Sequence, residues 1–246
     1  MEKQQQAEEG ATNGQTGHTN KRKIEEIEGG RRTGRLDAFV IRKKADTPKK
    51  LKAPSIEIVV QNGRSVVTYE KSVLSEDECA ELSQEVLIAG HWSRDVIPTF
   101  GKNVLSPRLV CSFGDVGTAY RYSGMIRKGT GWPEVLLAIK RLVEERANQP
   151  YNYVLCNLYK DGDDYIGWHA DKEGDIVPGS TIASVSLGAK RLFKLRHEQT
   201  KEVKEVWLEP GSLLLMKGDT QKHYKHCTVT ENRINLTFRL VNHRSG

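Results

Sequence analysis

Apolar and polar residues alternate along much of the chain after residue 54. The runs I-E-I-V-V and S-V-V-T-Y flank the stretch Q-N-G-R, and an Asn62-Gly63 pair between β-rich runs is typical of a hairpin turn. Residues 181–197 predict two further strands, T-I-A-S-V-S-L and R-L-F-K-L-R-H, joined at Gly188-Ala189. Pro210-Gly211 begins another run, S-L-L-L-M. Many short strands separated by turn residues indicate a domain built mainly from β-sheet.

Two segments have the helical period instead. The sequence S-E-D-E from Ser75 to Glu78 is a capping box at the start of a helix that Gly90 ends, with apolar positions at Cys79, Leu82, Val86 and Leu87. Pro133 begins a second helix, whose apolar stripe comprises Val135, Leu136, Ile139, Leu142 and Val143. We expect both helices to brace the outside of a sheet.

These elements together predict an α+β fold, a double-stranded β-helix of the jelly-roll type braced by helices, over residues 54–246. Residues 1–53 are rich in Gln, Glu, Gly, Lys and Thr and almost free of apolar residues. Such a segment cannot bury enough surface to fold, so we expect a disordered basic tail.

Most of the net charge lies in that tail. Residues 1–53 hold 13 Lys and Arg against 8 Asp and Glu, which accounts for +5 of the formal net charge of +6. Nucleic-acid binding by the nearly neutral remainder would therefore need a local basic face, for which the candidates are Lys102, Arg108, Arg121, Arg127 and Lys128. Each of them is equally well explained as an ordinary solvated charge.

The four cysteines are scattered without a C-x-x-C pair, which predicts reduced thiols in a nucleocytoplasmic compartment. No apolar run approaches 18 residues, and the N-terminus lacks the pattern of a secretory signal. The sequence therefore favours neither a membrane protein nor an exported one.

Candidate metal ligands follow the stretch N-L-Y-K-D-G-D-D-Y-I-G-W-H-A-D at residues 157–171. His169 and Asp171 lie two positions apart, so an extended backbone directs both side chains to one side. With a second histidine they would form the two-histidine, one-carboxylate set of non-haem Fe(II) oxygenases. His226 and His223 compete for that third position. Alone, a His-x-Asp triplet is more often a surface feature without a metal.

The C-terminal stretch R-I-N-L-T-F-R strengthens this interpretation. In a strand, Arg233, Asn235, Thr237 and Arg239 share one face. Two buried guanidinium groups need anionic partners, and a short dicarboxylate would fit between them. Asn157 and Tyr159, also two apart, add polar groups to the same interior.

Six ordered motifs resemble the AlkB family of Fe(II)/2-oxoglutarate-dependent nucleic-acid demethylases, in particular its duplex-acting nuclear branch. They are N-x-Y-K-D-G, G-W-H-x-D, I-A-S-V-S-L-G, E-P-G-S-L-L-L-M, H-Y-K-H and R-I-N-L-T-F-R, and the resemblance covers roughly residues 70–242. It implies a dioxygenase that binds Fe(II) through His169, Asp171 and His226, and it favours His226 over His223. It also implies 2-oxoglutarate binding by Asn157, Tyr159, Arg233, Thr237 and Arg239, with O2 as second co-substrate and ascorbate as reductant in vitro.

The activity that the resemblance implies is DNA repair. It predicts oxidative demethylation of 1-methyladenine and 3-methylcytosine, flipped out of duplex DNA, with release of formaldehyde, succinate and CO2. Three alternatives stay open: a single-strand or RNA demethylase of the same family, a catalytically silent nucleic-acid-binding module, and a 2-oxoglutarate oxygenase of small molecules.

The same resemblance assigns substrate contacts to three segments. Phe100, Gly101 and Lys102 match a hydrophobic wedge that fills the gap left by the flipped base, although Thr99 replaces an aliphatic residue and Phe100 could instead fold back onto the core. Tyr120, Arg121 and Tyr122 match the substrate pocket, where Tyr122 would stack on the base opposite His169. Lys172 replaces an acidic residue and is followed by the matching Glu173. Either Lys172 turns to a phosphate, with Glu173 supplying the negative charge, or the preferred substrate differs.

The tail contains two short motifs. Lys21-Arg22-Lys23 with Arg31-Arg32 is a candidate nuclear import signal, which predicts a nuclear location. Residues 33–40, T-G-R-L-D-A-F-V, resemble a degenerate PCNA-binding box with Leu36 and Phe39 at its anchor positions. The alternatives for this second motif are a chance cluster or a strand docked on the domain.

Overall fold

The computed structural model describes residues 55–99, 102–122, 125–161, 163–229 and 232–242. The predictions for the tail, including its nuclear import and PCNA motifs, and those for Phe100 and Gly101 lie outside the described residues. No helix within the described ranges has the length and apolar character needed to cross a membrane.

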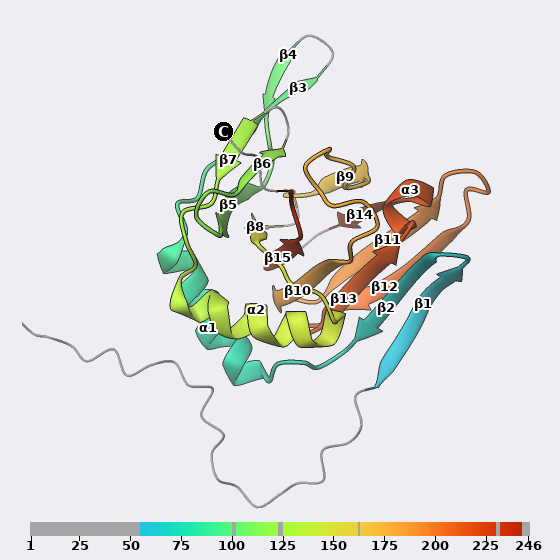
Figure 1. Ribbon diagram of the computed structural model, residues 1–246, viewed down its shortest axis with the longest axis horizontal. Helices are drawn as coiled ribbons and strands as arrows, with labels where there is room; N and C mark the ends of the chain where they lie inside the picture. The colour runs from blue at the N-terminus through green and yellow to red at the C-terminus, as the bar shows by residue number, and fades with distance from the viewer. Residues whose placement is uncertain (1–54, 100–101, 123–124, 162, 230–231, 243–246) are drawn as a thin grey trace, which may run out of the picture. The chain divides into compact units, whose positions relative to one another are not determined.

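A seven-stranded antiparallel sheet forms the larger layer, in the order β1-β2-β13-β10-β15-β8-β5 (Figure 1). Its strands are β1 (Ile56–Asn62), β2 (Ser65–Glu70), β5 (Leu109–Gly114), β8 (Tyr153–Tyr159), β10 (Ile182–Gly188), β13 (Leu213–Gly218) and β15 (Arg233–Arg239). The predicted hairpin is confirmed as β1 and β2, with Asn62 paired to Ser65 and the turn at Gly63-Arg64.

A four-stranded antiparallel sheet, in the order β12-β11-β14-β9, packs against part of the first. Its strands are β9 (Ile166–His169), β11 (Arg191–His197), β12 (Val203–Leu208) and β14 (Tyr224–Val229). Buried side chains from both sheets form one apolar cluster that includes Phe193 and Leu195 of β11 and Leu214 and Met216 of β13. The burial of these side chains holds the two layers together.

The turn at Gly188 carries the chain from one sheet to the other. β10 pairs with β13 and β15, whereas β11 pairs with β12 and β14. Gly188 has a φ of 85°, a conformation that glycine adopts without steric cost. Two facing sheets linked in this way confirm the predicted jelly-roll core.

Two helices cover the outer face of the larger sheet, as predicted (Figure 1). α1 (Glu76–Ala89) begins with the complete capping box of Ser75 and Glu78 and buries Cys79, Leu82 and Val86. Leu87, predicted on the apolar stripe, is instead 41% exposed, because it follows the buried Val86 by one residue and so lies about 100° around the helix from it. α2 (Glu134–Ala147) buries Val135, Leu136, Ile139 and Val143, and Leu142 is partly buried.

Two small hairpins complete the described domain. One comprises β3 (Val96–Thr99) and β4 (Lys102–Leu105), and it projects from the body of the molecule (Figure 1). The other comprises β6 (Ala119–Tyr122) and β7 (Met125–Lys128). A short helix, α3 (Thr220–His223), links β13 to β14.

Candidate active site and metal centre

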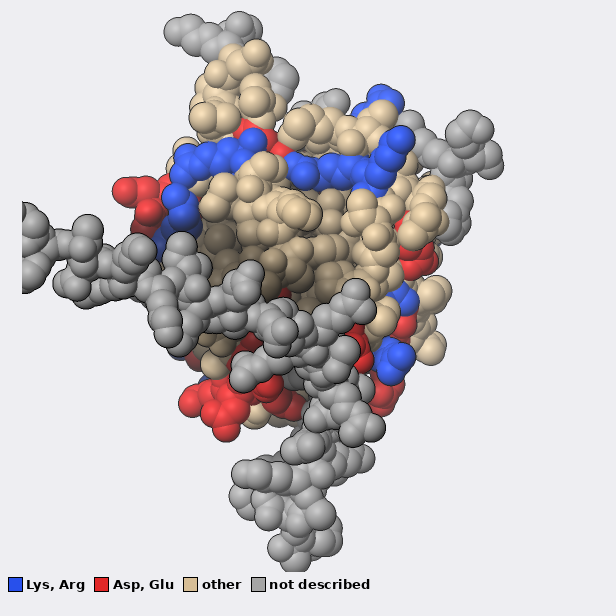
Figure 2. All heavy atoms as spheres, turned by 90° about the vertical axis from the view of Figure 1, so that its left-hand side faces the viewer, with Lys and Arg blue, Asp and Glu red and all other residues tan. Residues whose placement is uncertain are grey.

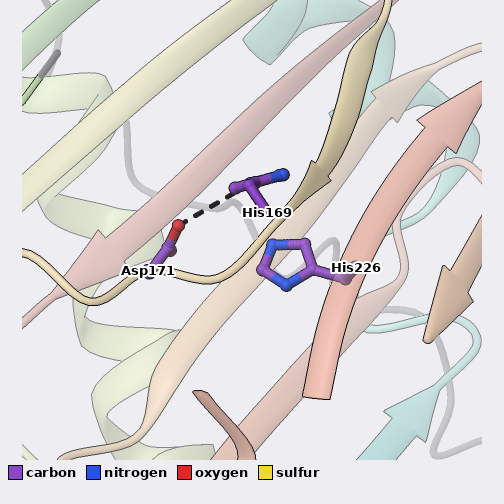
Figure 3. Close-up of side chains that lie close together, drawn as sticks. All are labelled: His169, Asp171 and His226. Atoms are coloured by element: carbon purple, nitrogen blue, oxygen red, sulfur yellow. Dashed lines mark ion pairs between the residues drawn. The ribbon is translucent and has the colours of Figure 1, made fainter. Parts of the chain in front are cut away.

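Three side chains with metal-ligating atoms meet at the edge of the smaller sheet. β9 ends at His169, which lies directly opposite His226 of β14, and Asp171 follows two residues beyond the strand end. The ligand atoms of the three residues lie within 4.8 Å of one another. Figure 3 shows them pointing toward one another, with the His169 Nε2 to Asp171 Oδ1 distance at 3.7 Å. Two imidazoles and one carboxylate in this arrangement suit Fe(II) and leave coordination positions open.

The orientation of His169 is fixed by its own strand. Its Nδ1 lies 2.8 Å from the carbonyl oxygen of Gly167, so that nitrogen donates and Nε2 is left free as a ligand. His223 lies elsewhere, on α3, with its Nδ1 3.1 Å from Ser65 Oγ. The structure therefore brings His226, and not His223, to the His169 and Asp171 pair.

Asp171 is buried and held in its charged form. Its Oδ2 accepts a hydrogen bond from Arg239 Nη2 at 2.7 Å. Burial alone would raise the pKa of Asp171, but the Arg239 guanidinium and the two imidazoles lower that pKa to about 2. A carboxylate is therefore present for a cation at any pH near neutrality.

The two histidines are held neutral. Burial lowers the pKa of His226 to about 3, assisted by the nearby His169, and burial also lowers the pKa of His169. The Phe193 ring stacks on His226 with centroids 5.3 Å apart, which excludes water from that side. Neutral imidazoles have a free lone pair, so both residues are ready to bind a metal without losing a proton.

A cavity of about 40 Å³ opens beside the three ligands. All five residues predicted to bind 2-oxoglutarate line it: Asn157, Tyr159, Arg233, Thr237 and Arg239. They come from neighbouring strands, since Tyr159 of β8 pairs with Arg233 of β15, and Asn157 pairs with Asn235. Alternate residues of a strand point to the same side, so these two adjacent strands place the five predicted residues on one wall of the cavity.

Arg233 has unused hydrogen-bonding capacity. Its side chain is buried, and Nη2 donates to Ser186 Oγ at 2.9 Å, but Nε and Nη1 have no hydrogen-bond partner. Burial and the nearby Arg191 lower the pKa of Arg233 to about 10, so the group still carries a positive charge at neutral pH. A buried guanidinium with two free donors is suited to a carboxylate ligand, so the chemistry of the lining residues suits an oxo-dicarboxylate next to the metal ligands.

Arg239 occupies the other end of the cavity wall. It contacts Asp171 directly and lies over the Tyr120 ring, 5.4 Å from its centroid. Burial would lower the pKa of Arg239, but the charge of Asp171 raises it above the ordinary value. The two predicted arginines therefore have different surroundings, one beside the metal ligands and one with donors to spare.

Arg108 corrects one prediction. The sequence makes it a candidate for an exposed basic face, but its side chain is buried and lines the cavity, because Arg108 immediately precedes β5, which pairs with β8 beside the site. Arg108 Nε donates to Asn157 Oδ1 at 2.8 Å, and Nη2 donates to the Tyr122 hydroxyl. Nothing in the local sequence pattern distinguishes this arginine from a solvated one.

Asn235 and Phe193 also line the cavity, and neither was given a role from the sequence. Asn235 Nδ2 donates to Ser184 Oγ at 2.7 Å, and its Oδ1 accepts from Thr237 at the same distance. Its place between Arg233 and Thr237 on one strand face was a signal that could have assigned it.

The predicted substrate residues lie in different places. Tyr122 lines the cavity with His169, whereas Tyr120 is fully buried behind it, between Tyr122 and Tyr153. Arg121 is exposed, and its backbone N–H donates to Asp175 Oδ2 at 2.7 Å.

Lys172 and Glu173 line a second cavity next to α3, not the cavity of the metal ligands. Lys172 is exposed, and Glu173 is half-buried. Burial raises the pKa of Glu173, and the charge of Asp171 raises it further. Lys102 belongs to β4, but its side chain lies outside the described set.

Comparison with known proteins gives a consistent set of matches. A family model described as the 2OG-Fe(II) oxygenase superfamily matches residues 66–239. The DNA oxidative demethylase ALKBH2 of Mus musculus is 40% identical over 175 residues, which cover 65% of this chain and 72% of that protein. The Homo sapiens protein of the same name is 39% identical over 175 residues, covering 65% of this chain and 66% of that protein.

A more distant relative and a solved structure extend this set. The alpha-ketoglutarate-dependent dioxygenase alkB homolog 3 of Bos taurus is 35% identical over 150 residues, or 55% of this chain and 52% of that protein. A solved structure titled "The structure of OsALKBH1" matches with a TM-score of 0.55 at 16% identity, covering 75% of this chain and 100% of that chain. At that identity the match supports the fold alone.

Proposed function

Because the chain belongs to the 2OG-Fe(II) oxygenase superfamily, and within it to the AlkB family, we propose that it repairs DNA by oxidative demethylation of N-alkylated bases. As a dioxygenase of this superfamily it uses Fe(II), 2-oxoglutarate and O2. The observation that carries the proposal is one buried cavity lined by both the three metal-ligating side chains and three arginines.

His169, Asp171 and His226 would hold the iron, whose chemistry with 2-oxoglutarate and O2 is to oxidise an N-methyl group. The remaining residues orient the reactants around that centre. Arg239 keeps Asp171 ionised and lies at the end of the cavity assigned to the keto acid group, together with Asn157. Arg233 and Tyr159 would bind the distal carboxylate, for which the free Nε and Nη1 of Arg233 are suited.

The substrates we propose are 1-methyladenine and 3-methylcytosine in DNA, and the products are formaldehyde, succinate, CO2 and the unmodified base. The relatives named DNA oxidative demethylase support DNA as the substrate class. A methyl group on the pairing edge weakens pairing, which lowers the cost of flipping the base into an enclosed site. The Tyr122 ring, in the cavity wall with His169, is the flat surface on which such a base would stack.

A basic surface is available for the DNA backbone. Figure 2 shows Lys and Arg side chains in a row across the face that carries β5 and β7. Arg121 and Lys128, from the β6 and β7 hairpin, are both exposed, whereas Arg127 forms an ion pair with the buried Asp95. We propose that the exposed pair contacts phosphates, while the β3 and β4 hairpin, with Val104 and Leu105 exposed, approaches the strands near the lesion.

The nuclear location and PCNA binding through residues 33–40 remain proposals from the sequence. Both belong to the tail, outside the described residues. They suit an enzyme that acts on chromosomal DNA, and deletion of residues 1–53 from the full chain tests them by microscopy and by PCNA pull-down.

The test of the main proposal uses matched single-stranded and double-stranded oligonucleotides that carry one 1-methyladenine or one 3-methylcytosine. Full-length protein is incubated with Fe(II), 2-oxoglutarate and ascorbate, and the loss of the methyl mass is followed, with His169→Ala as the matched control. Repair of the duplex that requires 2-oxoglutarate and is absent from the control supports the proposal. Turnover of RNA or single strands alone would replace it with the single-strand alternative, and no turnover on any strand would favour a silent binding module.

A further inference from the structure

The three candidate metal ligands are held in place in different ways. His169 and His226 face each other across the β9 and β14 ladder, so sheet hydrogen bonding fixes both backbones. Asp171 lies two residues beyond the end of β9 and outside any described strand. Its carboxylate is bound by Arg239, and its backbone N–H donates to the side-chain Oε1 of Gln221 at 2.9 Å. The Gln221 side chain therefore restrains the backbone of Asp171, as strand pairing restrains the backbones of the two histidines.

Hydrogen bonds to the larger sheet fix the backbone around Gln221. This residue belongs to α3, whose first residue, Thr220, is buried and donates to the Lys217 carbonyl oxygen at 2.6 Å. The backbone N–H of Asp219 donates to the carbonyl oxygen of Arg64 at 3.2 Å, and this contact joins α3 to the turn between β1 and β2. The position of the Gln221 backbone is thus set by the larger sheet.

The orientation of the Gln221 amide is also defined. Its Nε2 lies 3.2 Å from Met216 Sδ, a weak acceptor that suits an N–H donor. The oxygen therefore faces the Asp171 N–H, which can only donate. Gln221 also lies five residues before His226, so the same amide connects the loop of one candidate ligand to the segment that leads into another.

We propose that Gln221 is a positioning residue of the metal centre, which holds Asp171 in register with His169 and His226 by accepting its backbone N–H. The inference rests on the assignment of Asp171 as a metal ligand in the proposed function. Partners of this kind, which bind a ligand residue and not the metal, typically change metal affinity by about 10-fold to 100-fold when removed.

The loop that carries Asp171 has room to move if this contact is lost. A cavity of about 440 Å³ lies between residues 172–180 and α3, and Asp171, Lys172 and Gln221 are among its lining residues. Without an acceptor, the buried N–H of Asp171 would seek water in that cavity and draw the backbone away from the histidines.

Manganese(II) titration of the full chain by calorimetry, without 2-oxoglutarate or DNA, tests the proposal independently of activity. Gln221→Leu removes the acceptor and should weaken Mn(II) binding at least about tenfold. Gln221→Glu keeps an oxygen in reach of the same N–H and should bind Mn(II) more tightly than Gln221→Leu does. Lys222→Ala, the exposed neighbour on α3, is the matched control and should bind as the wild type does.

The outcomes distinguish a failure of the role assigned to Gln221 from a failure of the proposed metal site. Wild-type affinity in Gln221→Leu overturns the role of Gln221 alone, and an equally weak Gln221→Glu overturns the acceptor role. Absence of Mn(II) binding by the wild type overturns the proposed metal site and this inference with it. If Gln221→Leu also lowers the thermal midpoint of the metal-free protein, Gln221→Met, which keeps the side-chain length without the amide oxygen, repeats the measurement in a better-packed background.

Discussion

The floor of the cavity and its rim are built by different kinds of structure. The floor lies on β8 and β15, central strands of the seven-stranded sheet, and its residues are fixed by ladder pairing on both sides. The rim includes Tyr122, which lies at the end of β6 in the short hairpin with β7. Because central strands restrict a side chain far more than a short hairpin does, substitutions in the floor should affect chemistry and those in the rim should affect substrate choice.

The largest effect is expected at the metal ligands. Asp171→Ala should lower turnover by at least about 10³-fold, because it removes a ligand of the metal that supplies the oxidising chemistry. His223→Ala is the matched control, since this histidine contacts Ser65 and not the site, and it should retain most activity. Demethylation is measured by mass spectrometry, and comparable activity in both variants would refute the assignment of the ligands.

Removal of the free donors in the floor should have the next largest effect. Arg233→Met should raise the KM for 2-oxoglutarate by about 10-fold to 100-fold, the loss expected for charged hydrogen bonds of about 1.5–3 kcal/mol. The KM for DNA should change little, because Arg233 lies in the floor. Succinate release at varied 2-oxoglutarate gives both constants, and an unchanged KM for 2-oxoglutarate would place the distal carboxylate elsewhere.

In the rim, Tyr122→Ala should lower kcat/KM for methylated DNA by about 5-fold to 100-fold, since stacking on an aromatic side chain is worth about 1–3 kcal/mol per base. The KM for 2-oxoglutarate should stay the same. Tyr122→Phe keeps the ring and loses only the hydrogen bond from Arg108, so it should recover most of the activity. A similar loss in both variants would indicate that the hydroxyl and not the ring is required.

The smallest effect is expected at Lys172. This side chain is exposed and does not line the cavity of the metal ligands, so Lys172→Ala should change kcat/KM less than about threefold at moderate salt, as for surface substitutions of about 0.5 kcal/mol. Initial rates on 1-methyladenine DNA at two salt concentrations measure it. A large gain in activity would show that Lys172 repels the cationic base from within the site, contrary to its place in the structure.

The difference between residues fixed by strand pairing and residues placed by tertiary packing explains what the sequence could predict. The floor follows from the two-residue period of strands, which places Arg233, Thr237 and Arg239 on one face regardless of the path of the chain. Arg108 and Gln221 lie where strands or helices begin, and the direction of a side chain at such a point depends on tertiary packing. The capping box located the start of α1, but the exposure of Leu87 was missed because this residue lies about 100° around the helix from the buried Val86.

The turn at Gly188, where the chain passes from one sheet to the other, restricts which residues can occupy that position. A Cβ atom at Gly188 would lie 3.2 Å from the carbonyl oxygen of Asn232 and 3.3 Å from the Cα of Arg233. Any larger residue at the turn would press on the first residue of β15, whose side chain presents the free donors of the cavity floor. A position with no side chain thereby leaves room for the backbone of Arg233, and the demand for glycine there comes from the placement of that arginine as well as from the turn.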